Sequence, residues 1–299
     1  MTYLHTLILG IVEGISEFLP ISSTGHLILA SHLLHLKQTD FQKSFEIAIQ
    51  LGAILSVVVL YWRTLLINFE VLKRIITAFI PTAILGFIFY KTIKRVLLGS
   101  NTVVLCSLLI GGIFLVLFEL WHREKESASG DLSDISYSKS FIIGLCQAVA
   151  MIPGVSRSAA TIIGGLLLEI KRKTIVEFSF LLSVPTMAAA TGLDLMKSAG
   201  HFSLEEFNLL LLGFISSFVV ALLSIKWLIH FIKNHTFISF GIYRILVSLS
   251  FWSLILRGQK YRDFYPTVYV PPHSSFSPHF RISTEFSGNK SAALHLEKY

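Results

Sequence analysis

Long apolar segments constrain this chain more than any other feature of its sequence. The 299 residues are 53% hydrophobic and 14% charged, whereas soluble globular proteins carry about 25% charged residues. Several apolar runs approach the roughly 20 residues that cross a bilayer as a helix. We therefore predict an all-α, polytopic membrane protein in contact with the lipid bilayer, with about six transmembrane helices near residues 45–62, 75–90, 102–121, 177–193, 209–229 and 237–256. The formal net charge of +7 does not indicate a nucleic-acid partner, because Lys and Arg are scattered through short loops, as is usual in membrane proteins.

The first apolar segment is interrupted by the sequence EGISEFLPISSTGH, from Glu13 to His26. Pro20 breaks a helix because it lacks an N–H group and clashes with the preceding turn. The Ser-Ser-Thr-Gly run that follows suits an irregular turn and the cap of a new helix beginning near His26. Non-helical backbone at membrane depth is tolerated only where it is buried in protein or lines a wet cavity. Ionisable groups at that depth are candidates for a functional site.

A second apolar segment is interrupted by MIPGVSRSAAT, from Met151 to Thr161. Arg157 follows Pro153-Gly154 and lies between two serines, and a helix is expected to resume at Ala159. The guanidinium group is a planar donor that matches phosphate oxygens. Serine hydroxyls and the start of a helix add further donors, so this break predicts an anion site.

The two breaks lie in halves of the chain that resemble each other. With an offset of 134 residues, the first-half residues Gly10, Glu13 and Ser22 fall on Gly144, Gln147 and Ser156. We predict one integral membrane domain, residues 1–256, made of two repeats at about 1–121 and 141–256 that are joined by a polar linker, 122–140. If each broken segment enters and leaves the membrane on the same side, the repeats are inverted relative to each other. Residues 257–299 are polar and are expected to form a poorly ordered tail.

Together the breaks offer the groups that phosphoryl transfer at a membrane requires. Arg157 would meet the charge of the transferred group, a serine would attack, and His26 or a glutamate would move the proton. Structural alternatives stay open: Arg157 could be an arginine at a helix end, Glu13 and Glu17 could be its structural partners, and the serines could be caps. A transporter or flippase for a phosphorylated lipid or another anion is the functional alternative, since it needs charge complementarity but no nucleophile.

Three other ionisable residues in the apolar segments are expected to serve structure. Arg244, beside Tyr243 in the last predicted helix, is expected to make an ion pair. Glu46 and Glu177 are expected to lie at the N-terminal ends of their helices, where acidic side chains are favoured.

The two broken motifs resemble those of the undecaprenyl-diphosphate phosphatase family of the bacitracin-resistance type. The segments FEIAIQLGAILSVVV, from Phe45 to Val59, and EFSFLLSVP, from Glu177 to Pro185, are also similar to that family. The resemblance implies an enzyme of the bacterial inner membrane that removes one phosphate from the diphosphate of a C55 polyprenyl carrier and so recycles the carrier for cell-wall synthesis. It also implies six spanning helices and two re-entrant helix pairs in an inverted repeat, a site open to the periplasmic or outer face, and a possible homodimer.

The same resemblance assigns roles to individual residues. It implies that Ser23 is the nucleophile, that His26 transfers protons beside the acidic pair Glu13 and Glu17, and that Arg157 holds the diphosphate. It further implies a divalent cation, magnesium in the first place, shared between Glu13, Glu17 and the substrate phosphates. The residues expected to bind substrate are Glu13, Ser22, Thr24, Gly154, Ser156 and Ser158. Ala159 departs from the glycine of many relatives, and the tail has no recognised counterpart.

Overall fold

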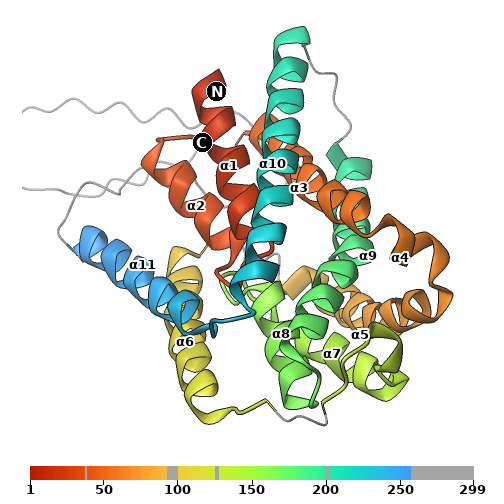
Figure 1. The fold of residues 1–299 in the computed structure, drawn as a ribbon. Coiled ribbons are helices and arrows are strands. Elements are labelled where there is room, and N and C mark those ends of the chain that lie inside the picture. Colours follow the sequence, from red (N-terminus) through yellow and green to blue (C-terminus); the bar gives the residue numbers. More distant parts are fainter. Residues whose placement is uncertain (38, 93–99, 125–127, 199–202, 257–299) are drawn as a thin grey trace, which may run out of the picture. The chain divides into compact units, whose positions relative to one another are not determined.

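The described part of the chain folds into α-helices (Figure 1). The computed structural model describes residues 1–37, 39–92, 100–124, 128–198 and 203–256, and the structural statements below concern these residues. Within them the only β pairing is an isolated bridge between Ser129 and Ile170. The elements are α1 (Tyr3–Ser16), α2 (Ser23–Leu33), α3 (Asp40–Leu60), α4 (Trp62–Ile67), α5 (Phe69–Thr92), α6 (Asn101–Trp121), the 3₁₀ turn η2 (Leu132–Asp134), α7 (Tyr137–Val149), α8 (Arg157–Leu167), α9 (Arg172–Ser198), α10 (Leu204–Phe231) and α11 (Ile238–Leu256).

Five helices are long and apolar enough to cross a membrane, which fits a multi-pass membrane protein. They lie in α3, α5, α6, α9 and α10, and α11 supplies a shorter apolar helix at the place of the sixth predicted span. Large apolar side chains on their outer faces are exposed, among them Phe87, Ile110 and Leu223, as expected for surfaces that contact hydrocarbon. Helices α5, α9 and α10 begin before the predicted positions, because charged residues in their first two turns ended the apolar runs of the prediction. Ser203 and Glu206 form a capping box at the start of α10.

Both predicted breaks are present, but each following helix begins earlier than the sequence suggested. Helix α2 begins at Ser23 instead of near His26, and α8 begins at Arg157 instead of Ala159. The reason is local, because the side chains of the preceding residues, Ser22 and Ser156, cap the helices at once. Their Oγ atoms accept hydrogen bonds from N–H groups in the first turns, at 3.4 Å in α2 and 3.2 Å in α8.

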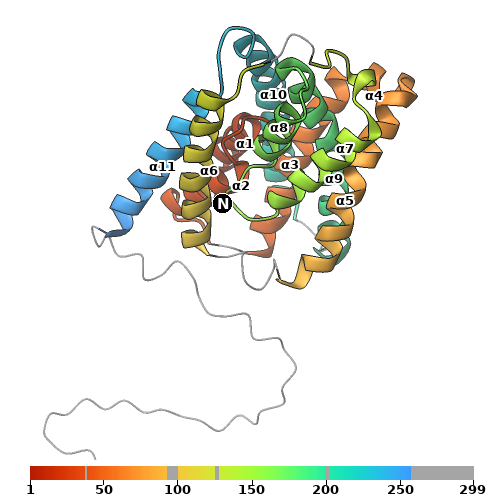
Figure 2. The ribbon, with the colours of Figure 1, turned by 90° about the horizontal axis from the view of Figure 1, so that it is seen from below.

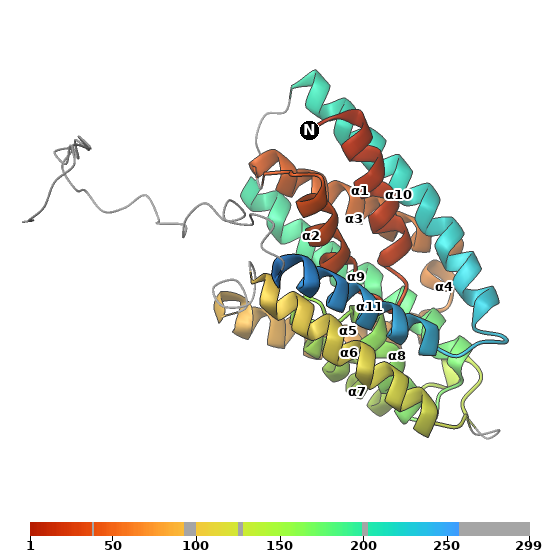
Figure 3. The same cartoon turned by 90° about the vertical axis from the view of Figure 1, so that its left-hand side faces the viewer.

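The two halves use equivalent helices for equivalent contacts. Helix α7 is the counterpart of α1, and α10 that of α5. Helix α1 packs on α10, and in the same way α7 packs on α5. Helices α3 and α6 pack on their own counterparts, α9 and α11. Figures 2 and 3 show α6 and α11 lying side by side. Gly10 and Gly144, paired by the offset of 134, each lie where a Cβ atom would collide with a backbone carbonyl of the partner helix. An internal repeat would produce paired contacts of this kind. The repeat and its inversion across the membrane stay predictions, and the predicted tail lies outside the described residues.

The first break is buried inside the protein. Phe18, Leu19 and Ile21 belong to the main hydrophobic cluster, together with residues of α3, α8 and α9. This irregular backbone is thereby kept from lipid, which is the condition for non-helical structure in a membrane.

Candidate active site

A pocket opens between the two breaks. It is lined by residues of both breaks, by Gln50 of α3 and by Met187 and Ala190 of α9. Seven of the residues predicted from the sequence line this pocket: Glu17, Ser22, Ser23, Thr24, Gly154, Ser156 and Arg157. Glu13, His26 and Ser158 are close by in the fold but are not among the lining residues.

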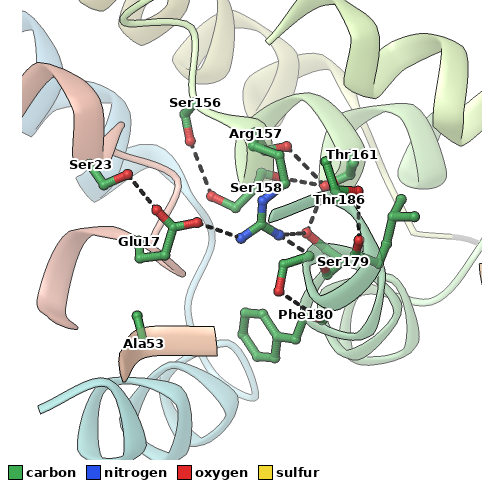
Figure 4. A network of polar contacts seen from close by, with 12 residues as sticks. Glu17, Ser23, Ala53, Ser156, Arg157, Ser158, Thr161, Ser179, Phe180 and Thr186 are labelled. Atoms are coloured by element: carbon green, nitrogen blue, oxygen red, sulfur yellow. Dashed lines mark hydrogen bonds and ion pairs between the residues drawn. The ribbon is translucent and has the colours of Figure 1, made fainter. Parts of the chain in front are cut away.

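A chain of polar contacts joins the first break to the second. Figure 4 shows Glu17 between Ser23 and Arg157. Ser23 Oγ donates to Glu17 Oε2 at 2.5 Å, and Arg157 Nη2 donates to Glu17 Oε1 at 2.9 Å. Hydroxyl-to-carboxylate bonds of this length are strong and charge-assisted. Glu17 is therefore placed to take the proton of Ser23, while its other oxygen accepts from the guanidinium group.

Other residues fix the direction of the Arg157 side chain. Its Nη1 donates to the carbonyl oxygen of Ser179 at 2.7 Å, and its guanidinium carbon lies 5.8 Å from the centre of the Phe18 ring. The Ser179 hydroxyl is in turn 2.6 Å from Thr161 Oγ1 (Figure 4). The Arg157 side chain is 13% exposed, so it is held by protein on one side and reaches the pocket on the other.

The two serines that flank Arg157 have different positions. Ser156 lines the pocket and caps α8. Ser158 is buried, and its Oγ donates to the carbonyl oxygen of Leu19 at 2.8 Å. Ser158 therefore ties the second break to the first, and of the two serines only Ser156 lines the pocket.

His26 is held by two contacts, neither of them with Ser23. Its Nδ1 lies 2.8 Å from the carbonyl oxygen of Ser22, and its Nε2 lies 2.8 Å from Tyr243 Oη. Since a carbonyl only accepts, Nδ1 carries a proton, and in a neutral ring Nε2 then accepts from the tyrosine. Both ring nitrogens are therefore occupied. The sequence left either His26 or a glutamate to take the proton of the attacking serine, and of these Glu17 is the one that contacts the Ser23 hydroxyl.

Glu13 is fully buried one helical turn before Glu17. Neither of its carboxylate oxygens has a hydrogen-bond partner among the described residues. Glu17, Glu46 and Arg157 are close enough to act on it through charge. Across the described part of the chain, no group of three His, Cys, Asp or Glu side chains is arranged to hold a metal ion. A cation held here would have Glu13 and Glu17 as its protein ligands, since magnesium commonly takes one or two carboxylates, substrate phosphates and water.

Some residues around the site were not predicted from the sequence. Gln50 lines the pocket, and its signal was a single amide inside the apolar run from Phe45 to Val59. Glu46 lies inside α3 and Glu177 inside α9, neither of them at the start, so the expected role of both as N-terminal acids is wrong. Arg244 makes no ion pair within the described residues; it donates instead to backbone carbonyls of both breaks. The expectation of an ion pair missed that carbonyl oxygens can satisfy a buried guanidinium group.

The fold and the pocket define a multi-pass α-helical membrane protein whose serine, carboxylate and arginine meet between two broken helices. The chain belongs to the BacA family: the family model described as Bacitracin resistance protein BacA matches residues 6–250. A relative from Aquifex aeolicus is 54% identical over 86% of this chain and 100% of its own length. Relatives from Persephonella marina and Methanococcus aeolicus are 52% and 44% identical, over 86% and 82% of this chain and 100% and 96% of theirs. Each of the three bears the name Undecaprenyl-diphosphatase.

Proposed function

We propose that the protein is an undecaprenyl-diphosphate phosphatase, which releases inorganic phosphate from the diphosphate of the C55 carrier lipid. The family and the names of its relatives support this activity. The observation that carries it here is the contact between Ser23 Oγ and Glu17 Oε2, beside the guanidinium group of Arg157. A transporter or flippase would need the arginine but not a serine bonded to a carboxylate, so the arrangement favours hydrolysis.

In the proposed first step Ser23 attacks the terminal phosphorus of the diphosphate. Its proton passes to Glu17 Oε2, the atom it already contacts. The bond from the terminal phosphorus to the bridging oxygen breaks, and that oxygen leaves with undecaprenyl phosphate. Arg157 donates to the phosphate oxygens, which offsets the charge that develops on them. Ser156 and the free N–H groups at the start of α8 add further donors.

In the second step water attacks the phosphorus of phosphoserine. The bond between phosphorus and Ser23 Oγ breaks, and Glu17 returns its proton to that oxygen. Both protons of the water leave with inorganic phosphate, so the starting state of the site is restored. One carboxylate therefore acts first as base and then as acid.

The buried oxygens of Glu13 would hold a magnesium ion, with Glu17 and the substrate phosphates as further ligands. The ion would supply positive charge opposite the diphosphate. Glu13 has no other hydrogen-bond partner among the described residues, which supports this role over a purely structural one.

We place the enzyme in the bacterial inner membrane, with the pocket toward the periplasmic or outer face. Hydrolysis there would return the carrier to cell-wall synthesis, and a faster supply of monophosphate would give resistance to bacitracin. The multi-pass fold supports the membrane location, and the side of the pocket and a homodimer are inferences from the family resemblance.

The test is phosphate release from C55 diphosphate by the full chain in detergent with magnesium. Ser23→Ala should lose activity by at least about 10³-fold, as expected when an attacking hydroxyl is removed. Ser31→Ala is the matched control, since Ser31 lies on the same helix and its buried Oγ has no partner among the described residues. An inactive wild-type protein, or a fully active Ser23→Ala variant, would overturn the proposal.

A further inference from the structure

Two adjacent residues of α11 contact the broken segments: Tyr243 contacts the side chain of His26, and Arg244 contacts backbone carbonyls. Arg244 is 1% exposed, although an arginine is among the costliest residues to bury without a partner. No acidic side chain pairs with it in the part of the chain that the structure describes. The burial of Arg244 therefore needs an explanation other than an ion pair.

The Arg244 guanidinium group binds carbonyl oxygens from three segments. Its Nη2 donates to Gly154 at 2.9 Å and to Ser107 of α6 at 3.0 Å, and its Nη1 makes a longer contact of 3.5 Å with Pro20. Pro20 lies in the first break and Gly154 in the second. One buried cation thus connects both irregular loops to the same point of α6.

The neighbouring sequence makes room for this group. Gly154 has φ +93°, a conformation suited to glycine, and a Cβ atom there would lie 2.6 Å from the carbonyl oxygen of Val104. At Gly111 of α6, a Cβ atom would collide with the guanidinium group of Arg244. The two glycines let α6 and the second break come close to Arg244 of α11.

Tyr243 acts on the other side of the same site. Its Oη lies 2.8 Å from His26 Nε2, and the two rings are stacked at 5.5 Å. His26 Nδ1 in turn donates to the carbonyl oxygen of Ser22. Ser22 has φ +74° and directly precedes Ser23. The contacts run from tyrosine to histidine to the strained residue that sets the direction of the Ser23 side chain.

We infer that Tyr243 and Arg244 are positioning residues for the reaction: Tyr243 holds Ser23 in place through His26 and Ser22, and Arg244 fixes the two breaks relative to each other. The inference rests on the proposed function, because it takes Ser23 as the attacking group. It gives His26 a role in orientation, with the proton of Ser23 going to Glu17. A small displacement of an attacking atom lowers rates strongly, so this pair of residues matters although neither lines the pocket.

The first test uses Tyr243→Phe, which keeps the stacked ring and removes only the hydroxyl. We expect kcat to fall about tenfold, as for other residues that orient a reacting group, with KM within about twofold of wild type. Tyr137→Phe is the matched control. Tyr137 Oη contacts Glu70, and neither residue belongs to a break, so this variant should keep wild-type kinetics. In a His26→Ala background, Tyr243→Phe should lower kcat no further, because tyrosine acts through histidine.

The second test uses Arg244→Lys, whose single ammonium group cannot reach carbonyls in both breaks. We expect kcat to fall by about 10²-fold, while Arg74→Lys, which alters another arginine bonded to a backbone carbonyl, stays near wild type. Hydrogen exchange of the peptide spanning residues 17–26 should be about fivefold faster in Tyr243→Phe and Arg244→Lys. This readout needs no turnover, so it tests the positioning role even if the wild-type protein were inactive.

The outcomes separate the two proposals. An inactive wild-type protein with faster exchange in both variants would reject the phosphatase, and with it any role in the reaction, and would keep only the structural part of the inference, that Tyr243 and Arg244 hold the two breaks. An active wild-type protein with unchanged kcat and exchange in Tyr243→Phe would reject the positioning role alone. An equal loss from Tyr243→Phe with and without His26 would also overturn it, since the tyrosine would then act by another route.

Discussion

The two breaks have nearly the same backbone but different chemistry. Ser22 and Ser156 are related by the offset of 134, and both precede a helix with φ of 74° and 78° and a side-chain cap. The next residue in each half is the first of the new helix, and it is Ser23 in one half and Arg157 in the other. The same turn thus presents a hydroxyl from the first half and a cation from the second.

This comparison shows how a repeated turn can form an asymmetric site. Positive φ is uncommon for serine and is seen where surrounding structure enforces it. Here it directs the first helical side chain of each half toward the space between the breaks, where Glu17 joins them. The second half has no acidic residue at either equivalent position, since the offset pairs Glu17 with Met151 and Glu13 with Gln147. The shared backbone supplies geometry, and the differing side chains supply the reaction.

The largest loss of activity should follow the removal of Arg157, the cation of the second break. Arg157→Ala should lower kcat/KM by about 10³-fold or more, because the transferred phosphate loses its main charged donor. Arg157→Lys keeps the charge but not the planar fork, and should recover only part of the loss. Phosphate release by folded, purified protein measures both. Arg74→Ala is the control, and near-wild-type activity of Arg157→Ala would remove this residue from the site.

A smaller loss of activity should follow when Glu13 is replaced by the residue of its counterpart, Gln147. Glu13→Gln should lower activity by at least about tenfold and raise the magnesium concentration needed for half-maximal rate, since a carboxylate ligand is lost. Chelation by EDTA should abolish wild-type activity and added magnesium should restore it. A Glu13→Gln variant with an unchanged magnesium response would contradict the cation site.

The reverse change, Gln147→Glu, should affect stability and spare the chemistry. Gln147 Nε2 donates to Thr82 and Thr186 at 3.0 Å each, and a buried carboxylate would lose both bonds. We expect the free energy of unfolding to fall by about 1–3 kcal/mol, seen as a lower thermal midpoint in detergent. The activity per folded molecule should not change, and a loss of kcat would show that the second half also contributes to the reaction at this position.

The smallest effects are expected at the capping serines themselves. Ser156→Ala removes a cap at a position with positive φ and should cost about 1–2 kcal/mol of unfolding free energy. Ser156→Gly should recover most of this, because glycine adopts the backbone without strain and is a tolerable cap. Thermal unfolding of the two variants gives the comparison. An alanine variant as stable as the glycine variant would mean that the positive φ is not a source of strain.

Much of this architecture could be predicted from local sequence. Apolar length indicated the spanning helices, and Pro20 and the Pro153-Gly154 pair located the breaks, because proline and glycine disfavour a regular helix. The polar residues that follow these two sites distinguish them from Pro81 and Pro185, which lie inside α5 and α9. The predicted helix starts were less accurate. A serine cap lets a helix begin at the next residue, and the charged first turns of the spanning helices extend beyond the apolar run.

Contacts between distant segments were beyond local reasoning. Glu17 and Arg157 are 140 residues apart, and their meeting was expected only from the repeat and the family resemblance. His26 and Tyr243 are 217 residues apart, and no local pattern relates them. Arg244 was singled out as a buried charge, but its partners are backbone carbonyls, which every sequence contains and which therefore give no signal.

The stereochemical course at the terminal phosphorus tests the central claim most directly. A C55 diphosphate made chiral at that phosphorus with sulfur and oxygen isotopes would be hydrolysed in isotopically labelled water, and the configuration of the released thiophosphate determined. Each in-line displacement inverts the phosphorus. Attack by Ser23 followed by water makes two displacements, so the account predicts retention. Inversion would show that water attacks the substrate directly, and would contradict the role of Ser23 as nucleophile.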